Sequence, residues 1–195
     1  MSAEVMLAFL KQCNLESRLG FQAAVHCAPV LKGIKISNIM TVEKGTRKIF
    51  QKALRGSNIL CIPLSVQGHR EVLLLYRYEK LRQHLRKEQV QNFLKSCGYS
   101  DMSVEAVIIK LRNRYARYVE NRQQFPHELG IILEYPVEDV QGFIKNQGKN
   151  FLLEKYWKVY QNKETAKAIF AQYDKARELA MQEVIAGYAL HQIAV

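Results

Sequence analysis

The segment Ile59–Tyr78 reads ILCIPLSVQGHREVLLLYRY and carries the plainest structural signal in the chain. Two apolar runs, Ile59–Val66 and Glu71–Tyr78, flank the turn residues Gln67-Gly68-His69, which is typical of a β-hairpin. Pro63 has no backbone N–H to donate to a neighbouring strand. We therefore expect the first run to lie at an edge of the sheet or to contain a bulge.

Around the hairpin, the spacing of apolar residues predicts helices and two further strands. Ile34–Val42 alternates weakly, and Phe151–Tyr160 places Trp157 and Val159 on one face of a strand. The predicted helices follow from their apolar stripes, caps and stops. They are Ala3–Lys11, Thr46–Leu54, Glu79–Leu85, Glu88–Ser96, a helix after Ser103, two short helices either side of Tyr135-Pro136, and a long one between Asn162 and Gly187.

This pattern predicts an α+β fold with a single domain over residues 1–195. Its expected parts are a small antiparallel sheet of three to four strands, helices that cover it, and a long C-terminal helix. The sheet is expected to contain the hairpin and the Trp157 strand, with Ile34–Val42 as a further candidate. Because a tryptophan in a strand buries a large area, Trp157 is expected in the core.

Composition constrains the class of protein and its surroundings. The 195 residues carry a formal charge of +11, which allows a polyanionic partner such as nucleic acid or an acidic protein, and equally a solvated lysine-rich surface. The four cysteines are scattered without a C-x-x-C pair, and no signal segment precedes them, which favours a cytoplasmic location. The strand-sized apolar run Val72–Leu75 is far too short to span a membrane.

A possible reactive thiol lies in the sequence His26-Cys27-Ala28-Pro29. Proline disfavours a helical residue before it and fits the first turn of a helix after it. We therefore expect Cys27 at or just before the N-terminus of a short helix that ends at Gly33. There the helix macrodipole favours the thiolate form of a cysteine.

The stretch Phe125–Tyr160 holds an unusual density of special residues. It contains the only tryptophan, two of the four prolines and three of the ten glycines. His127 and Glu128 directly follow Pro126, where a turn would present both side chains. Asp139 is expected to stabilise the first turn of the helix that Pro136 begins, which is a structural role.

Six sequence blocks along the chain have the character of a family signature: HCAP (26–29), LYR (75–77), FPHELG (125–130), YPVEDVQGFI (135–144), NQGKN (146–150) and WKVY (157–160). These blocks resemble the signature of a bacterial domain-of-unknown-function family, number 3793. The resemblance spans nearly the whole chain but implies no known activity. Members are often encoded near flavodoxins and ferrous-iron transport genes, which implies a link to iron or redox chemistry and a flavodoxin-like partner. Two glycines usual in the family are absent, at Glu134 and at Lys155-Tyr156.

The first functional hypothesis is a ligand or cofactor site formed where the His26-Cys27 turn meets the His127-Glu128 turn. Imidazole and thiolate are ligands of borderline metals and of haem iron, so His26, Cys27 and His127 are the candidate ligands of a metal ion or haem. The predicted walls of this site are Tyr76, Arg77, Tyr135 and Trp157. The alternative is that these residues have structural roles, with Cys27 as a small buried hydrophobe and His127 as a capping or core residue.

Two further hypotheses belong to other classes. A thiol-dependent enzyme would use Cys27 as nucleophile and His127 as base, with Glu128 or Asn146 orienting the base. A binding module for nucleic acid or an acidic protein would instead use exposed tyrosines and arginines of the helix after Ser103. Its candidate cations are Arg77, Arg112, Arg114 and Arg117.

Overall fold

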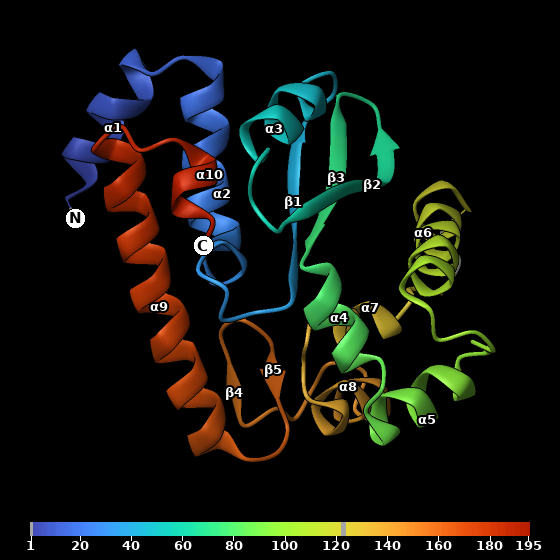
Figure 1. The fold of residues 1–195 in the computed structure, drawn as a ribbon. Coiled ribbons are helices and arrows are strands. Elements are labelled where there is room, and N and C mark those ends of the chain that lie inside the picture. The colour runs from blue at the N-terminus through green and yellow to red at the C-terminus, as the bar shows by residue number, and fades with distance from the viewer. Residues whose placement is uncertain (1, 122–123) are drawn as a thin grey trace. The chain divides into compact units, whose positions relative to one another are not determined.

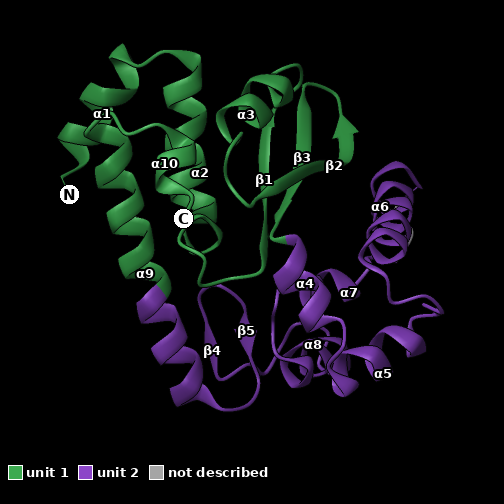
Figure 2. Cartoon of the chain, in the orientation of Figure 1, with its two compact units in different colours: residues 1–77, 173–195 green, residues 78–172 purple. Residues whose placement is uncertain are grey.

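The computed structural model describes residues 2–121 and 124–195, which form two compact units (Figures 1 and 2). Unit 1 combines the residues up to Arg77 with Tyr173–Val195, and unit 2 is Tyr78–Gln172. The boundary between the units falls inside the long helix α9 (Lys163–Ile185). The expectation of a single domain over 1–195 stays a prediction.

Unit 1 contains a three-stranded antiparallel sheet with strand order β1-β3-β2. The predicted hairpin forms β2 and β3, and β1 is the third strand, as its weak alternation indicated. Pro63 has the expected effect, because β2 is an edge strand and its register with β3 shifts between Pro63 and Ser65. The elements are α1 (Ala3–Gln12), α2 (Leu15–Leu31), β1 (Ser37–Glu43), α3 (Arg47–Ala53), β2 (Leu60–Gln67), β3 (Arg70–Tyr76), the C-terminal part of α9, and α10 (Leu190–Ile193).

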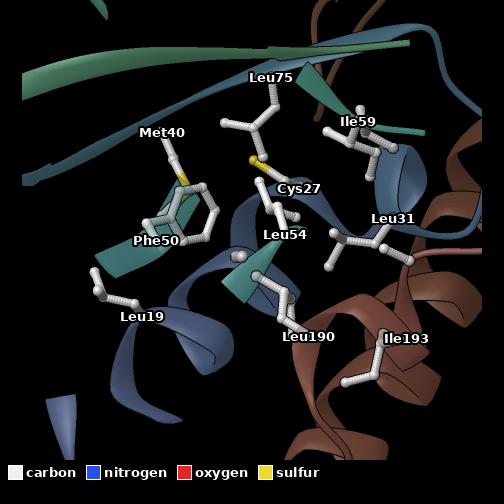
Figure 3. Close-up of a cluster of buried hydrophobic side chains, with 14 of the residues drawn as sticks. Leu19, Cys27, Leu31, Met40, Phe50, Leu54, Ile59, Leu75, Leu190 and Ile193 are labelled. Carbon is white, nitrogen blue, oxygen red and sulfur yellow. The ribbon is translucent and has the colours of Figure 1, made fainter. Parts of the chain in front are cut away.

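The core of unit 1 lies between α2 and the sheet (Figure 3). Phe50, Leu31 and Leu75 are fully buried there, and Leu190 and Ile193 of α10 join the same cluster. Burial of several such side chains stabilises the fold by about 1.5–3 kcal/mol each before entropy is counted. This packing, rather than intrinsic helix propensity, explains why α2 is long.

Helix α2 corrects one local prediction. Cys27 does not lie at a helix N-terminus, because α2 runs without interruption from Leu15 to Leu31 and contains Pro29. A proline inside a helix removes one hydrogen bond, and near the C-terminal end that cost is small against the burial of the helix face. The Pro29 carbonyl, one of the last in α2, accepts hydrogen bonds from the N–H groups of Ile34 and Lys35.

Unit 2 is mainly helical, with one short hairpin. The segment Phe151–Tyr160 is not one strand, as predicted, and it does not join the hairpin's sheet. It forms two strands of two residues each, paired only with each other. The elements are α4 (Tyr78–His84), α5 (Glu88–Ser96), α6 (Val104–Asn121), α7 (Glu128–Ile132), α8 (Val137–Lys145), β4 (Leu153–Glu154), β5 (Lys158–Val159) and the N-terminal part of α9.

The aromatic side chains of this hairpin explain its shape. Trp157 is 8% exposed, as expected for a core residue, and stacks on Tyr135 with 5.4 Å between ring centroids. The ring of Phe170 meets it edge-on at 4.5 Å. The chain turns back at Lys155-Tyr156 so that Trp157 and Val159 point into unit 2, which leaves only two residue pairs for a ladder.

Asp139 anchors the same hairpin to α8. Its buried carboxylate accepts hydrogen bonds from Trp157 Nε1 at 2.7 Å and from the backbone N–H groups of Tyr160 and Gln161 at 2.7 and 3.0 Å. Three of the about four acceptor positions of this carboxylate are filled. Asp139 therefore has a structural role, as predicted, and the role extends well beyond the first turn of α8.

The predicted fold class is confirmed. The chain is α+β, with a small antiparallel sheet, a separate two-stranded hairpin and the long helix α9 near its C-terminus. Within residues 2–121 and 124–195, no helix is both long and apolar enough to cross a membrane.

His84 in α4 gives unit 2 a pH-dependent stability. The imidazole is 6% exposed, its Nε2 bonds the Ile131 carbonyl at 3.0 Å, and its buried Nδ1 has no partner in the part of the chain that the structure describes. Burial, helped by Lys87, lowers the pKa of His84 to about 4. The unfolded chain takes up this proton near pH 6.5, so folding stability falls as the pH drops from about 6.5 to about 4.

We expect His84→Phe to remove this dependence, because phenylalanine fills similar space and does not titrate. Wild type should lose about 3 kcal/mol more than the variant between pH 7 and pH 4. Urea unfolding curves at pH 7, 5 and 4 measure the difference. If the free energy of unfolding falls by the same amount from pH 7 to pH 4 in both proteins, His84 does not titrate as stated.

Candidate functional site

The predicted site residues divide between the two units. His26, Cys27, Tyr76 and Arg77 belong to unit 1, whereas His127, Glu128, Tyr135 and Trp157 belong to unit 2. Each group is therefore described within its own unit.

His26 and Cys27 are neighbours on α2 but face different surroundings. His26 is exposed, and Cys27 is fully buried among apolar side chains that include Leu75 (Figure 3). The Cys27 thiol donates a weak hydrogen bond to the Ile39 carbonyl at 3.9 Å. Burial raises the pKa of Cys27 to about 12, so the thiolate is negligible at neutral pH. These surroundings disfavour Cys27 as a nucleophile or as a metal ligand.

A direct measurement of thiol reactivity checks this conclusion. In the native protein, iodoacetamide should modify the half-buried Cys13 and Cys97 first and leave Cys27 intact until the protein unfolds. Peptide mass spectrometry after timed alkylation at pH 7.5 reports each site, and Cys13→Ala and Cys97→Ala variants confirm the assignment. Rapid alkylation of Cys27 in the native protein would revive the thiol-enzyme hypothesis.

Arg77 has a structural role in unit 1. Its guanidinium donates hydrogen bonds to the carbonyls of Val30 and Leu31 at 2.9 and 3.0 Å, and to the Val195 carbonyl. The last carbonyls of a helix lack partners within the helix and attract cations. Arg77 therefore caps the C-terminus of α2, and Tyr76 before it is buried as well. Neither side chain has the exposure of a ligand-contacting wall or of a nucleic-acid contact.

Glu128 is likewise a buried structural group. It is 1% exposed, lies 2.5 Å from Arg114 Nε, and accepts a hydrogen bond from the Tyr99 hydroxyl at 3.1 Å. The Arg114 guanidinium also donates to the Cys97 carbonyl at 3.2 Å. This ion pair ties α6 to the start of α7. Of the basic residues predicted on α6, only Arg112 and Arg117 remain exposed.

His127 is the predicted site residue with the surroundings of a binding site. It is half-buried at the start of α7, and neither ring nitrogen has a hydrogen-bond partner among the described residues. Burial is the main influence on its pKa and lowers it, with Glu128 acting in the opposite direction. The imidazole is therefore neutral at pH 7, and its lone pair is available for coordination or hydrogen bonding.

Two aromatic rings contact His127, and further rings extend the group. Phe125 and Phe143 lie with their ring centroids 5.5 and 5.7 Å from the imidazole. The Phe125 ring in turn contacts the rings of Tyr118 and Tyr115, with centroid distances of 5.1 and 6.4 Å. We call His127, Phe125, Phe143, Tyr115 and Tyr118 the aromatic frame. The ring pairs within it are tilted or edge-to-face.

Sequence reasoning missed part of the frame. Tyr115 and Tyr118 of α6 and Phe143 of α8 belong to no sequence motif that indicates a binding site. Tyr118 is 36% exposed, which a pure core residue would not be. The available signal was the spacing of three residues between the tyrosines, which places both rings on one side of a helix.

Tyr135 and Trp157 lie in the packed interior of unit 2, where they stack on each other. Burial raises the pKa of Tyr135. The described residues include no group of three or more His, Cys, Asp or Glu side chains that could hold a metal ion.

The fold and the frame define a two-unit α+β protein with a half-buried histidine set among aromatic rings. The chain belongs to the family described as "Protein of unknown function (DUF3793)", whose model matches residues 23–194. No curated protein and no solved structure matched the chain.

One departure from the family pattern has a visible consequence. Glu134, where the resemblance predicts a glycine, has a φ of 62°. This left-handed conformation favours glycine and strains other residues. It lets the chain leave α7 sharply, and the Tyr135 N–H bonds back to the Gly130 carbonyl at 2.9 Å.

Proposed function

We propose that the protein binds a flat, iron-containing macrocycle of the haem class, with His127 as the axial ligand. The observation that carries the proposal is a half-buried imidazole with two unbonded nitrogens inside an aromatic frame. Haem iron needs only one strong protein ligand, and a neutral imidazole supplies it. An aromatic surround suits the large apolar faces of the macrocycle.

Lys158 supports this choice of ligand class. Its ammonium group lies 5.9 Å from the centre of the Phe143 ring and 4.8 Å from that of Phe151, and it donates a hydrogen bond to the Gly148 carbonyl at 2.9 Å. Its ion pair with Glu154, at 3.8 Å and partly exposed, is weak. The ammonium group can therefore exchange this partner for a carboxylate group of such a cofactor. The frame and Lys158 thus match the apolar and acidic parts of one ligand.

A hemin titration tests the proposal. We expect the wild type to bind one equivalent with a Soret band distinct from that of free hemin, and His127→Ala to weaken binding about tenfold or more. His69→Ala is a matched control, because His69 is an exposed histidine in the turn of unit 1. His26→Ala examines the other predicted ligand and should behave like the control. Equal affinity and an unchanged spectrum in His127→Ala would contradict the proposal.

We also infer a cytoplasmic location and a redox-linked role. All four cysteines are unpaired, and two of them, Cys27 and Cys61, are buried, which fits a reducing compartment. An iron cofactor would supply the redox chemistry. A flavodoxin-like or other acidic protein is a natural partner for a chain of charge +11.

A further inference from the structure

We propose that unit 1 carries a second binding site, for a small monocarboxylic acid with an apolar body. The site is a hollow of about 330 Å³ between the N-terminal half of α2, the end of β1 and the start of β3. Its size suits a small molecule, although it lies at the lower end of the usual range. The residues that carry the argument are Arg18, Arg70, Glu43, Leu15, Leu19 and Val42.

Two guanidinium groups line the hollow and have bonding capacity to spare. Arg70 has no hydrogen-bond or ion-pair partner among the described residues, and Arg18 makes one hydrogen bond, to the Leu10 carbonyl at 3.3 Å. Each guanidinium has five N–H donors in a planar arrangement that matches a carboxylate. Paired arginines at one hollow therefore select an anionic group.

Glu43 limits the charge that this hollow accepts. It lies directly opposite Arg70 in the β1–β3 register and lines the same hollow. Two arginines and one glutamate leave a net charge of +1. A carboxylate beside the binding position repels a dianion such as hydrogen phosphate (HPO₄²⁻) and tolerates a monoanion or a zwitterion.

The remaining lining provides an apolar surface on a rigid base. Leu19 and Val42 are largely buried and form its inner part, while Leu15 is more exposed. The Gln22 side chain donates to the Thr41 carbonyl at 2.6 Å and so joins α2 to β1 beside the hollow. Because both arginines are exposed, their electrostatic attraction for a carboxylate is weak. Burial of the ligand's hydrocarbon part must therefore contribute to the affinity.

Amide chemical shifts of the ¹⁵N-labelled protein, followed by NMR during titration with sodium benzoate and sodium hexanoate, test the site. We expect saturable shifts in residues 15–22 and 41–43, with a dissociation constant of about 1 mM. Inorganic phosphate at equal ionic strength and at pH 8, where the dianion dominates, should give no saturable shift there. Arg70→Met should weaken carboxylate binding about fivefold or more. Arg55→Met, which changes an exposed arginine elsewhere in unit 1, should not.

Glu43→Gln provides a second, independent variant. Removal of this carboxylate should allow phosphate to bind while carboxylate binding is kept or strengthened. The amide spectrum of each variant reports whether it is folded. The proposal is overturned by absence of saturable shifts with either acid, by phosphate binding as tight as that of the acids, or by unchanged affinity when both Arg18 and Arg70 are replaced by methionine.

Discussion

Gly142→Ala is expected to destabilise unit 2 by about 3 kcal/mol or more. An added Cβ at position 142 would lie 2.5 Å from Cγ and 2.6 Å from Cβ of Tyr160. These atoms are the base of the side chain, and the Tyr160 backbone is held by Asp139. The ring therefore cannot swing aside, and either α8 or the hairpin has to move.

Gly20→Ala is the matched control for this prediction. Gly20 also lies inside a helix, but its nearest neighbour to an added Cβ is Val184 Cγ1 at 4.0 Å, an ordinary contact. Alanine is the better helix former, so this change should be neutral or stabilising by about 0.5–1 kcal/mol. Urea unfolding measures both. If Gly142→Ala lowers the free energy of unfolding by no more than Gly20→Ala raises it, α8 and Tyr160 do not pack as closely as described.

Asp139→Ala is expected to cost about 3–5 kcal/mol, because three donors lose one buried acceptor. Trp157 Nε1 and the N–H groups of Tyr160 and Gln161 would all lack their partner. Asp139→Asn keeps one carbonyl oxygen and turns an NH₂ group toward a donor, so it should fall between wild type and the alanine variant.

Fluorescence of the single tryptophan reports this change directly. Trp157 emission should shift to longer wavelength in Asp139→Ala as the indole gains contact with water. Asp174→Asn is a suitable control, because Asp174 forms a partly exposed pair with Arg177 one helical turn away. Unchanged emission and stability in Asp139→Ala would show that the carboxylate does not hold the hairpin.

Much of the fold could be predicted because its signals are local. The turn at Gly68, the proline at position 63 and the periodic helices determine structure within a few residues of themselves. The wrong predictions concern segments whose conformation depends on tertiary packing. Pro29 indicated a helix start, but the apolar face of α2 is buried strongly enough to carry the helix through it.

The residues of the candidate site were predicted only in part, for a related reason. Residue type singled out His127, yet the same reasoning selected Cys27, Glu128 and Trp157, all of which are buried. Burial and partners distinguish a binding residue from a structural one, and neither is visible in a single sequence. The rings of Tyr115 and Phe143 meet His127 or Phe125 only through folding.

The most direct test of the central claim is chemical rescue of His127→Ala by free imidazole, followed by the Soret spectrum of the hemin complex. If His127 is the axial ligand, the variant lacks the wild-type spectrum, and added imidazole, bound in the space left inside the aromatic frame, restores it. The same addition should leave His69→Ala unchanged. A variant spectrum identical to wild type before imidazole is added would contradict the account.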